Sequence, residues 1–327
     1  MNVKLRNDAL FAALDNQSIL ESARKAGTVL EHSCRIGRCG VCKAKVISGE
    51  TDVIQAEESL VAEDEANGFI LTCCRAAKTD LQLDIEDLGE LGSIQTKTLP
   101  CRIDNLQLLS DDILEVVLRT PPASRLEYLP GQYVDMIGKD GLRRSYSVAN
   151  AGREDGKITL QIRKVKQGEM SQYWFEEAKP NDLLRMEGPL GTFCLRKSRA
   201  SQLILLATGT GIAPLKAILE QLSTTPTANT YSHIYLYWGG RTLQDIYWRP
   251  VFESLPLTFA PVLSRSPEWN GRKGYIQQAV LEDEHDLRDA VVYACGSETM
   301  IQSAYEQLVA AGLNSKHFYS DAFVSSS

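Results

Sequence analysis

The chain has 327 residues, of which 43% are hydrophobic and 24% charged, and its formal net charge is -7. This length exceeds one ordinary core, so we expect two or three domains, and the composition excludes a disordered protein. The negative charge argues against a nucleic-acid partner. Without a signal-peptide core or an apolar run of membrane-spanning length, we expect a cytoplasmic protein that contacts no membrane.

The first segment is predicted to form a small α+β domain. Residues 3–5 and 44–47 have the pattern of short strands, and residues 81–85 alternate like a third. A helix should run over 18–26, where Gly27 is placed to stop it.

Four cysteines of this domain have the spacing of iron ligands. Cys34, Cys39 and Cys42 form a C-x4-C-x2-C pattern, and Cys73 follows about thirty residues on, as in plant-type 2Fe–2S ferredoxins. The alternatives are scattered buried thiols or structural zinc, which usually needs paired C-x2-C knuckles. Cys74 competes for the place of fourth ligand, but the run Leu-Thr-Cys before it resembles the ferredoxin pattern and selects Cys73.

Glycines and charges surround these cysteines. Gly37 and Gly40 would let backbone N–H groups approach the cluster sulfurs without a Cβ in the way. An acidic run is interpreted as solvated surface, and a basic group among the cysteines could steer an acidic partner. The acidic run is Glu57, Glu58, Glu63, Asp64 and Glu65, and the basic group is Arg35, Arg38, Lys43 and Lys45.

Residues 101–196 consist of short strands separated by turns, which favours a small antiparallel β-barrel. On one strand, Arg144 can neutralise a phosphate, Tyr146 can lie against a flavin ring, and Ser147 can hydrogen-bond near its reactive nitrogen. An ordinary amphipathic strand is the alternative. The motif therefore suggests a flavin site only in combination with other motifs further along the chain.

A second cluster in the barrel segment, Gly168-Glu169-Met170-Ser171, leads into a helical run. Backbone N–H groups and the Ser171 hydroxyl at a helix N-terminus would form an anion site for a pyrophosphate. Two phosphate contacts argue for FAD over FMN. Gly168, Met170 and Ser171 are therefore predicted cofactor contacts.

From residue 201 onward, strands alternate with helices, which predicts a doubly wound α/β domain. A buried strand over 203–207 runs into Gly209-Thr210-Gly211-Ile212-Ala213-Pro214 and a helix. The glycines allow a tight turn near a pyrophosphate, and Pro214 suits the first helical turn. Cys295-Gly296 ends the last core strand, where the thiol could face a nicotinamide or simply pack in the core.

Together these motifs resemble a three-module reductase. It joins a plant-type ferredoxin domain (1–92), a ferredoxin–NADP reductase-like FAD barrel (98–198) and a nicotinamide-binding domain (200–327), with a linker over 89–93. Gly209, Thr210, Gly211 and Pro214 would then bind the nicotinamide cofactor, and Cys295 would sit near its hydride-donating carbon.

The C-terminal end departs from this pattern at one position. Phe323 matches the terminal aromatic that covers the flavin. Asp321 stands where these reductases usually have Glu. The candidate catalytic residues are Ser147, Cys295 and Asp321.

Five stretches, 70–74, 128–133, 143–150, 237–239 and 318–323, carry a closer resemblance. They resemble the CDP-6-deoxy-delta-3,4-glucoseen reductases, which supply electrons to a dehydrase in dideoxysugar synthesis. This resemblance implies NADH as donor and a sugar dehydrase as partner. Ser264-Arg265 and Lys273-Gly274-Tyr275 resemble the hydroxyl and basic groups that hold the 2′-phosphate of NADPH, which keeps NADPH open as the donor. Two rivals are the reductase of an aromatic or alkane oxygenase and a non-catalytic electron carrier.

Overall fold

The computed structural model describes residues 1–91, 94–138, 141–225 and 231–323. The chain divides after Gln95 into two compact units, the second running from Thr96 to Phe323. Residues 92–93 of the expected linker and the C-terminal residues 324–327 lie outside the described residues, and Gly89–Leu91 forms a single 3-10 turn.

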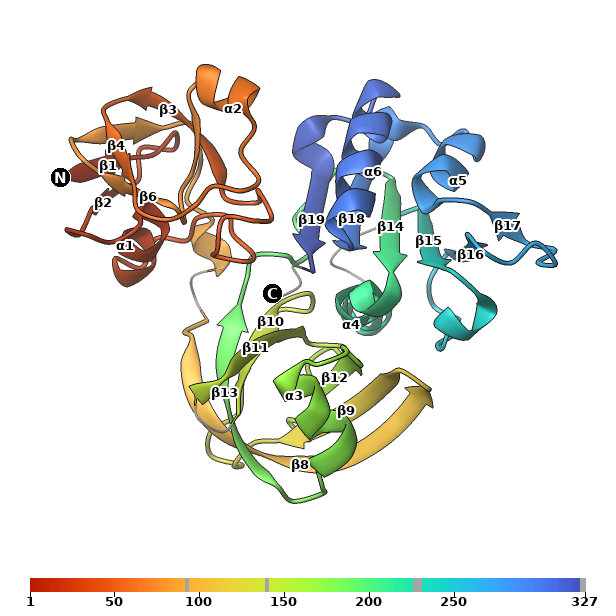
Figure 1. The fold of residues 1–327 in the computed structure, drawn as a ribbon. Coiled ribbons are helices and arrows are strands. Elements are labelled where there is room, and N and C mark those ends of the chain that lie inside the picture. Colours follow the sequence, from red (N-terminus) through yellow and green to blue (C-terminus); the bar gives the residue numbers. More distant parts are fainter. Residues whose placement is uncertain (92–93, 139–140, 226–230, 324–327) are drawn as a thin grey trace. The chain divides into compact units, whose positions relative to one another are not determined.

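The first unit is an α+β domain built on a five-stranded mixed sheet in the order β2-β1-β7-β3-β5, with a separate β4-β6 pair (Figure 1). The predicted helix is α1 (Ile19–Lys25), and the Ser18 hydroxyl caps it by accepting from the Glu21 N–H at 3.1 Å. Such a cap satisfies one of the orphan donors of the first turn. The remaining elements are β1 (Asn2–Lys4), β2 (Leu10–Ala12), β3 (Lys43–Ser48), β4 (Thr51–Val53), α2 (Ala62–Ala66), β5 (Phe69–Leu71), β6 (Arg75–Ala77) and β7 (Leu81–Leu83).

The second unit begins with an antiparallel six-stranded sheet in the order β11-β10-β13-β8-β9-β12. A bridge between Val148, just after β11, and Leu160 in β12 joins its two ends into a barrel. Inward-facing residues such as Ile103, Val116 and Val134 are fully buried there. Its elements are β8 (Lys97–Ser110), β9 (Ile113–Arg119), β10 (Tyr133–Ile137), β11 (Arg143–Ser147), β12 (Ile158–Arg163), α3 (Glu169–Gln172), a π-helix (Tyr173–Glu177) and β13 (Leu183–Leu190).

The rest of the second unit is a parallel six-stranded sheet in the order β17-β16-β15-β14-β18-β19. Strand β14 (Gln202–Thr208) is apolar on both faces: Leu203 and Leu205 pack toward α4 (Ile212–Thr224), whereas Ile204 and Leu206 pack toward helices on the other side. Burial on both faces is what an uninterrupted apolar run provides. The other elements are β15 (His233–Gly240), β16 (Leu257–Leu263), β17 (Arg272–Lys273), α5 (Ile276–Glu282), β18 (Ala290–Gly296), α6 (Glu298–Ala310) and β19 (Phe318–Ala322).

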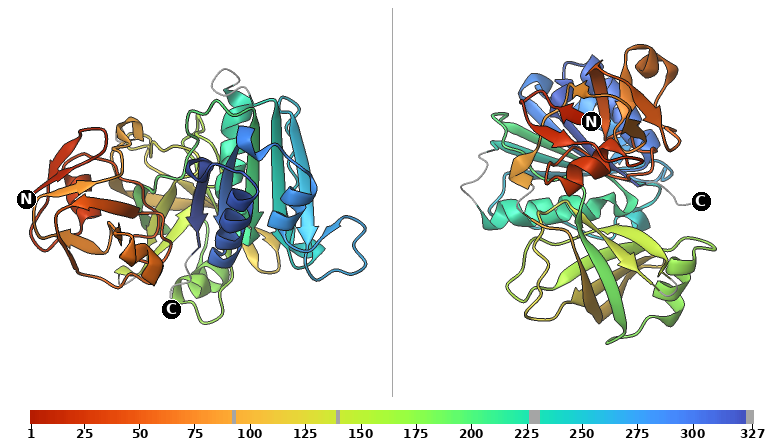
Figure 2. Two further views of the ribbon diagram at one scale, coloured as in Figure 1. Left: turned by 90° about the horizontal axis from the view of Figure 1, so that it is seen from above. Right: turned by 90° about the vertical axis from the view of Figure 1, so that its left-hand side faces the viewer.

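Helix α4 lies between the parallel sheet and the barrel, as the views in Figures 1 and 2 agree. Its N-terminus follows the 3-10 turn Gly209–Gly211 directly. The sheet architectures confirm the predicted fold class: an α+β domain, an antiparallel barrel and a doubly wound α/β domain. None of the helices formed by the described residues is long and apolar enough to cross a membrane.

Candidate functional site

The four predicted iron ligands lie in one region of the first unit and form two pairs. The Sγ atoms of Cys42 and Cys73 are 3.3 Å apart. Cys34 and Cys39 face each other, since the backbone N–H of each points to the sulfur of the other at 3.4 Å. Among the described residues, no three His, Cys, Asp or Glu side chains gather as they would around one metal ion. Two thiol pairs fit a two-iron cluster, whose four thiolates divide between its two irons.

Backbone N–H groups point at the cysteine sulfurs, as a cluster loop requires. The Ile36 N–H also donates to the Cys34 Sγ at 3.4 Å. The hydrogen bond with the Cys39 thiol, with further backbone donors, lowers the pKa of Cys34 to about 6. The thiolate is the form that binds iron, so this loop holds Cys34 close to its ligating state.

Gly37 is required by a contact that the sequence did not reveal. Its φ is +78°, and a Cβ there would lie 2.1 Å from the Ala56 carbonyl oxygen and 2.8 Å from the Cys74 Sγ. The expected reason was approach to the cluster sulfurs, whereas the closest neighbours are the Ala56 carbonyl and the Cys74 thiol. Cys74, which had no assigned role, is buried 3.4 Å from the Cys73 Sγ and donates to the Ala56 oxygen at 3.4 Å. Cys74 therefore packs between Cys73, Gly37 and Ala56.

The charged residues near the cluster are paired with one another. Interpreting the acidic run as solvated surface is wrong for Glu57, whose side chain is only 6% exposed. Its carboxylate accepts from the Leu71 N–H at 2.8 Å and from Arg75 at 2.7 Å. Two of the basic residues expected to face a partner form ion pairs within the unit: Arg38 with Glu58 at 3.0 Å and Lys43 with Asp64 at 2.7 Å.

The flavin motif lies on β11 of the barrel. Ser147 is 7% exposed, and its hydroxyl has no hydrogen-bond partner among the described residues. Tyr146 is half-buried, and its hydroxyl accepts from the Trp174 Nε1–H at 3.2 Å. Arg144 uses one guanidinium nitrogen on the Arg143 carbonyl at 2.8 Å and keeps the rest of its fork for other acceptors. A hydroxyl without a partner, on the same strand as an aromatic ring and a cation, fits a bound flavin.

The Gly168–Ser171 turn is less open to a ligand than the sequence suggested. Its helix α3 has only four residues before a π-helix continues it. The Ser171 hydroxyl oxygen already accepts from the Val165 N–H at 2.8 Å. Met170 is buried in the barrel core, against Gly138. The Gly168 N–H also donates already, to the Val165 carbonyl at 3.2 Å. The groups left for a phosphate are therefore the backbone N–H of Met170 and its helical neighbours and the proton of Ser171.

The dinucleotide turn is pressed against the end of β18. A Cβ on Gly211 would lie 2.1 Å from the Cys295 carbonyl oxygen. The φ of Gly211 is -58°, so the need for glycine there is close approach rather than an unusual backbone. Sequence reasoning assigned this glycine to the cofactor, but its nearest neighbour is the adjacent strand. Pro214 is buried on the first turn of α4, as expected.

Cys295 and Asp321 are opposite each other on the neighbouring parallel strands β18 and β19. Both side chains are buried. Burial, followed by the charge of Asp321, raises the pKa of the Cys295 thiol well above its usual value. The thiol is therefore neutral at physiological pH. The Phe323 N–H donates to the Gly296 carbonyl at 2.8 Å, which extends this pairing to the terminal aromatic.

Arg163 was missed by the sequence motifs. It ends β12 of the barrel, and its Nη1 would lie 3.0 Å from a Cβ on Gly209 in the dinucleotide turn. It also forms ion pairs with Asp112 at 3.1 Å and Asp245 at 3.2 Å. An arginine at the end of an ordinary alternating strand gives no signal in the sequence, because only folding places it beside a glycine 46 positions later.

Three family models match the chain in order. The 2Fe-2S iron-sulfur cluster binding domain matches residues 5–78, the oxidoreductase FAD-binding domain residues 100–194, and the oxidoreductase NAD-binding domain residues 205–306. The chain is also 42% identical to the CDP-6-deoxy-L-threo-D-glycero-4-hexulose-3-dehydrase reductase of Yersinia pestis, over 100% of this chain and 99% of that one. The chain belongs to this reductase family.

The reductase has further relatives. Protein RfbI of Salmonella typhimurium is 38% identical over 97% of this chain and 94% of its own. A terephthalate 1,2-dioxygenase reductase component of Comamonas is 29% identical over 97% of this chain and 95% of its own. The crystal structure of the cytochrome P450 reductase GcoB of Amycolatopsis superposes with a TM-score of 0.77 at 26% identity, covering 100% of both chains.

These matches confirm the predicted cofactor set and enzyme class. The reductase is an iron–sulfur flavoprotein oxidoreductase that moves electrons from a nicotinamide through FAD to its own 2Fe–2S cluster. Its family members are components that deliver electrons to a partner enzyme.

Proposed function

We propose that the reductase oxidises NADH and delivers the electrons, one at a time, to a dehydrase that removes the C3 hydroxyl of a CDP-6-deoxyhexulose. The supporting observation is the 42% identity, over the full length, with a reductase named for that dehydrase. The oxygenase reductase component shares the domain order but only 29% of its residues. Complete FAD- and NAD-binding domains also argue against a mere electron carrier.

Each cofactor contributes a distinct step. The bound nicotinamide supplies a hydride, FAD converts that two-electron input into single electrons, and the cluster carries one electron outward at a time. The protein's contribution is to hold these groups and to exclude side reactions.

In the barrel, the guanidinium of Arg144 would neutralise a flavin phosphate. Tyr146 would lie against the ring system, and the unpartnered hydroxyl of Ser147 would donate to the reactive ring nitrogen. Backbone groups of Gly168–Ser171 would meet the pyrophosphate. The backbone of Arg144, Tyr146 and Ser147 is held by the pairing of β11 with β10.

In the α/β domain, Gly209–Gly211 and the N-terminus of α4 would take the nicotinamide pyrophosphate, with the guanidinium of Arg163 beside them. Cys295, neutral and buried, and Asp321 would lie near the nicotinamide ring. In the first unit, Cys34, Cys39, Cys42 and Cys73 would bind the cluster.

The structure supports NADH as the donor. The Ser264 hydroxyl donates to the Gly240 carbonyl at 3.3 Å, and the Lys273 Nζ donates to the Pro267 carbonyl at 2.6 Å. The one proton of the Ser264 hydroxyl is thus already used on the end of β15, which disfavours a 2′-phosphate, whereas Lys273 keeps two further N–H donors.

The test is reconstitution of the purified holoenzyme with a CDP-6-deoxyhexulose 3-dehydrase, its sugar nucleotide and NADH. We expect NADH consumption coupled to a product deoxygenated at C3, with NADPH at least 10-fold less effective. The dehydrase alone is the control. If the reductase reduces cytochrome c with NADH but yields no deoxygenated sugar, the proposed partner is wrong. If it drives a ring-hydroxylating oxygenase as fast as it drives the dehydrase, the result favours the oxygenase alternative.

A further inference from the structure

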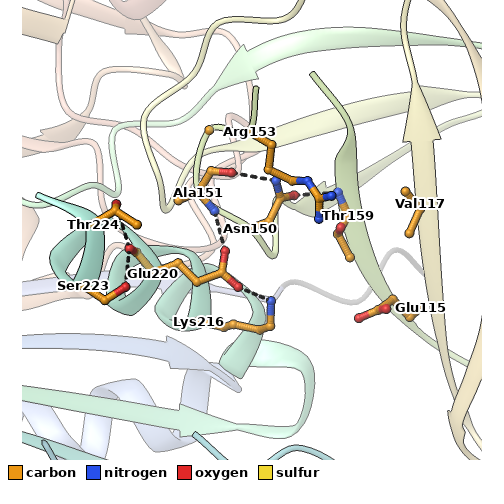
Figure 3. Close-up of a pocket in the computed structure, with 11 residues that line it drawn as sticks. Glu115, Val117, Asn150, Ala151, Arg153, Thr159, Lys216, Glu220, Ser223 and Thr224 are labelled. Carbon is orange, nitrogen blue, oxygen red and sulfur yellow. Dashed lines mark hydrogen bonds and ion pairs between the residues drawn. The ribbon is translucent and has the colours of Figure 1, made fainter. Parts of the chain in front are cut away.

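One face of helix α4 carries two charged residues that reach the barrel. Lys216 and Glu220 are one helical turn apart, and the Lys216 Nζ donates to the Glu220 Oε1 at 2.5 Å. The same ammonium donates to the Ala149 carbonyl at 3.0 Å. The Glu220 Oε2 accepts from the Ala151 N–H at 2.9 Å, as Figure 3 shows. Two side chains of the nicotinamide domain thus hold two backbone groups of the flavin barrel.

The barrel segment that they hold is rigid and begins just after Ser147. The Ala149 N–H donates to the Thr159 carbonyl at 2.8 Å. Asn150 is buried, and its side chain accepts from the Thr159 N–H at 2.6 Å and donates to the Tyr128 hydroxyl at 3.0 Å. A displacement of this segment would therefore be transmitted to the end of β11, where the flavin-facing hydroxyl is located.

The other end of the contact is equally direct. Helix α4 has 13 residues and starts where the dinucleotide turn Gly209–Gly211 ends. Lys216 is the fifth residue of this helix, about 6 Å along its axis from Ile212. The pair therefore links the segment after Ser147 to the turn that would hold the nicotinamide pyrophosphate.

The two halves also meet through the Arg163–Asp245 ion pair at 3.2 Å and through the Tyr247 hydroxyl, which donates to the Gln161 Oε1 at 3.1 Å. Beside Lys216 and Glu220 is a cavity of about 450 Å³, lined on the barrel side by Glu115, Thr159 and Arg153 and on the helix side by Ser223 and Thr224 (Figure 3). This space is not filled by apolar side chains. If the hydrogen bonds of Lys216 and Glu220 were removed, no close packing in the cavity would hold the barrel segment against α4 in their place.

We propose that Lys216 and Glu220 are positioning residues for hydride transfer, which set the distance between the flavin on the barrel and the nicotinamide on α4. This rests on the proposed roles of Ser147 and Gly209–Pro214. Neither side chain takes part in the chemistry. Their effect is geometric, and a misplacement of about 1 Å can cost about 100-fold in rate.

The experiment replaces Glu220 by Ala in the holoenzyme and measures single-turnover reduction of the flavin by NADH. We expect a rate constant about 10-fold lower with a smaller change in NADH affinity, and a larger isotope effect with NADH deuterated at C4. Glu220→Gln keeps an acceptor for the Ala151 N–H and should recover part of the rate. Oxidation of the dithionite-reduced enzyme by cytochrome c should be unchanged.

A matched control is Glu306→Ala, which removes a carboxylate that accepts from the Gln302 side chain on the exposed face of α6. It should behave as wild type. Hydrogen exchange provides a readout independent of turnover: the Ala151 amide should exchange about 10-fold faster in Glu220→Ala and not in Glu306→Ala.

Two outcomes overturn the proposal: wild-type hydride transfer in Glu220→Ala, or a slower rate that only follows flavin loss and a lower melting temperature. If NADH fails to reduce even the wild-type flavin, the proposed function fails instead, and the exchange measurement still decides whether the pair holds the Ala149–Ala151 segment.

Discussion

In the first unit, three of the four predicted cluster ligands lie within residues 34–42, whereas the residues proposed for the site of the second unit are as far apart as Ser147 and Asp321. A local loop can be recognised from the spacing of its residues alone, because residues close in sequence stay close in space however the remainder of the chain folds. A dispersed site depends on how strands and helices approach one another. Contacts without a motif therefore matter most in the second unit, as at Arg163, Lys216 and Glu220.

The largest effect should come from Cys73→Ser, which removes a local ligand. We expect complete loss of the cluster's visible absorbance and of its electron paramagnetic resonance signal after reduction. Flavin reduction by NADH should persist, because it takes place in the other unit.

Cys74→Ser is the matched control, since Cys74 packs against Cys73 without being a proposed ligand. It should retain the cluster. Retention in Cys73→Ser together with loss in Cys74→Ser would show that the wrong cysteine was chosen and that spacing did not decide the local site.

Glu57→Gln tests whether the cluster loop depends on a tertiary contact as well. The change removes the nearer carboxylate of Arg75 and leaves Glu65, 57% exposed, at 3.8 Å; breaking a buried ion pair costs about 3–5 kcal/mol. We expect faster cluster loss in urea, with a free energy of unfolding of the first unit about 3 kcal/mol lower.

Glu58→Gln is the matched control, because Glu58 pairs with Arg38 while 53% exposed. Exposed pairs contribute about 0–1 kcal/mol. Equal effects of the two changes would contradict the assignment of Glu57 as a buried support.

Gly211→Ala tests the dispersed site through the packing of its turn against β18. The added Cβ would meet the Cys295 carbonyl, and overpacking costs about 1–3 kcal/mol. We expect a lower melting temperature of the second unit and slower flavin reduction by NADH. Gly152→Ala, with nothing within 4 Å of the added Cβ, should change neither; a neutral Gly211→Ala would show that the turn can move away from the strand.

The smallest effect should come from His285, whose Nε2 lies 2.6 Å from the Tyr237 hydroxyl. Burial lowers the pKa of His285 below its usual 6.5, so the unfolded chain binds a proton there before the folded one does. Stability from this group is present above pH 6.5 and lost as the pH falls below it. The loss should be under about 1.4 kcal/mol per pH unit, because the ring is partly solvated.

In His285→Gln, urea unfolding should show a shallower decline in stability between pH 6.5 and 5, with no change in the rate of flavin reduction. If the free energy of unfolding fell equally steeply with pH in both proteins, His285 would have the same pKa in the folded and the unfolded chain, and the prediction would be wrong.

The sequence by itself determined the fold class, the cofactor set and the residues of the local motifs. Short-range patterns carry this information: the cysteine spacing, the Ser18 cap with Gly27, and a strand apolar on both faces before Gly209. The sequence could not predict why glycine is required at two positions of these motifs. Gly37 and Gly211 were attributed to cofactor approach, yet their nearest neighbours are Ala56 with Cys74 and the Cys295 carbonyl.

Only the tertiary structure decided which charged side chains are buried and which of them join the α/β domain to the barrel. Glu57 is part of an acidic run that looks like solvated surface, and Glu220 is one of many helical acids. A side chain's environment depends on what folding brings beside it, here Arg75 in one case and the Ala151 amide in the other. Such long-range approaches leave no periodicity or spacing in the chain.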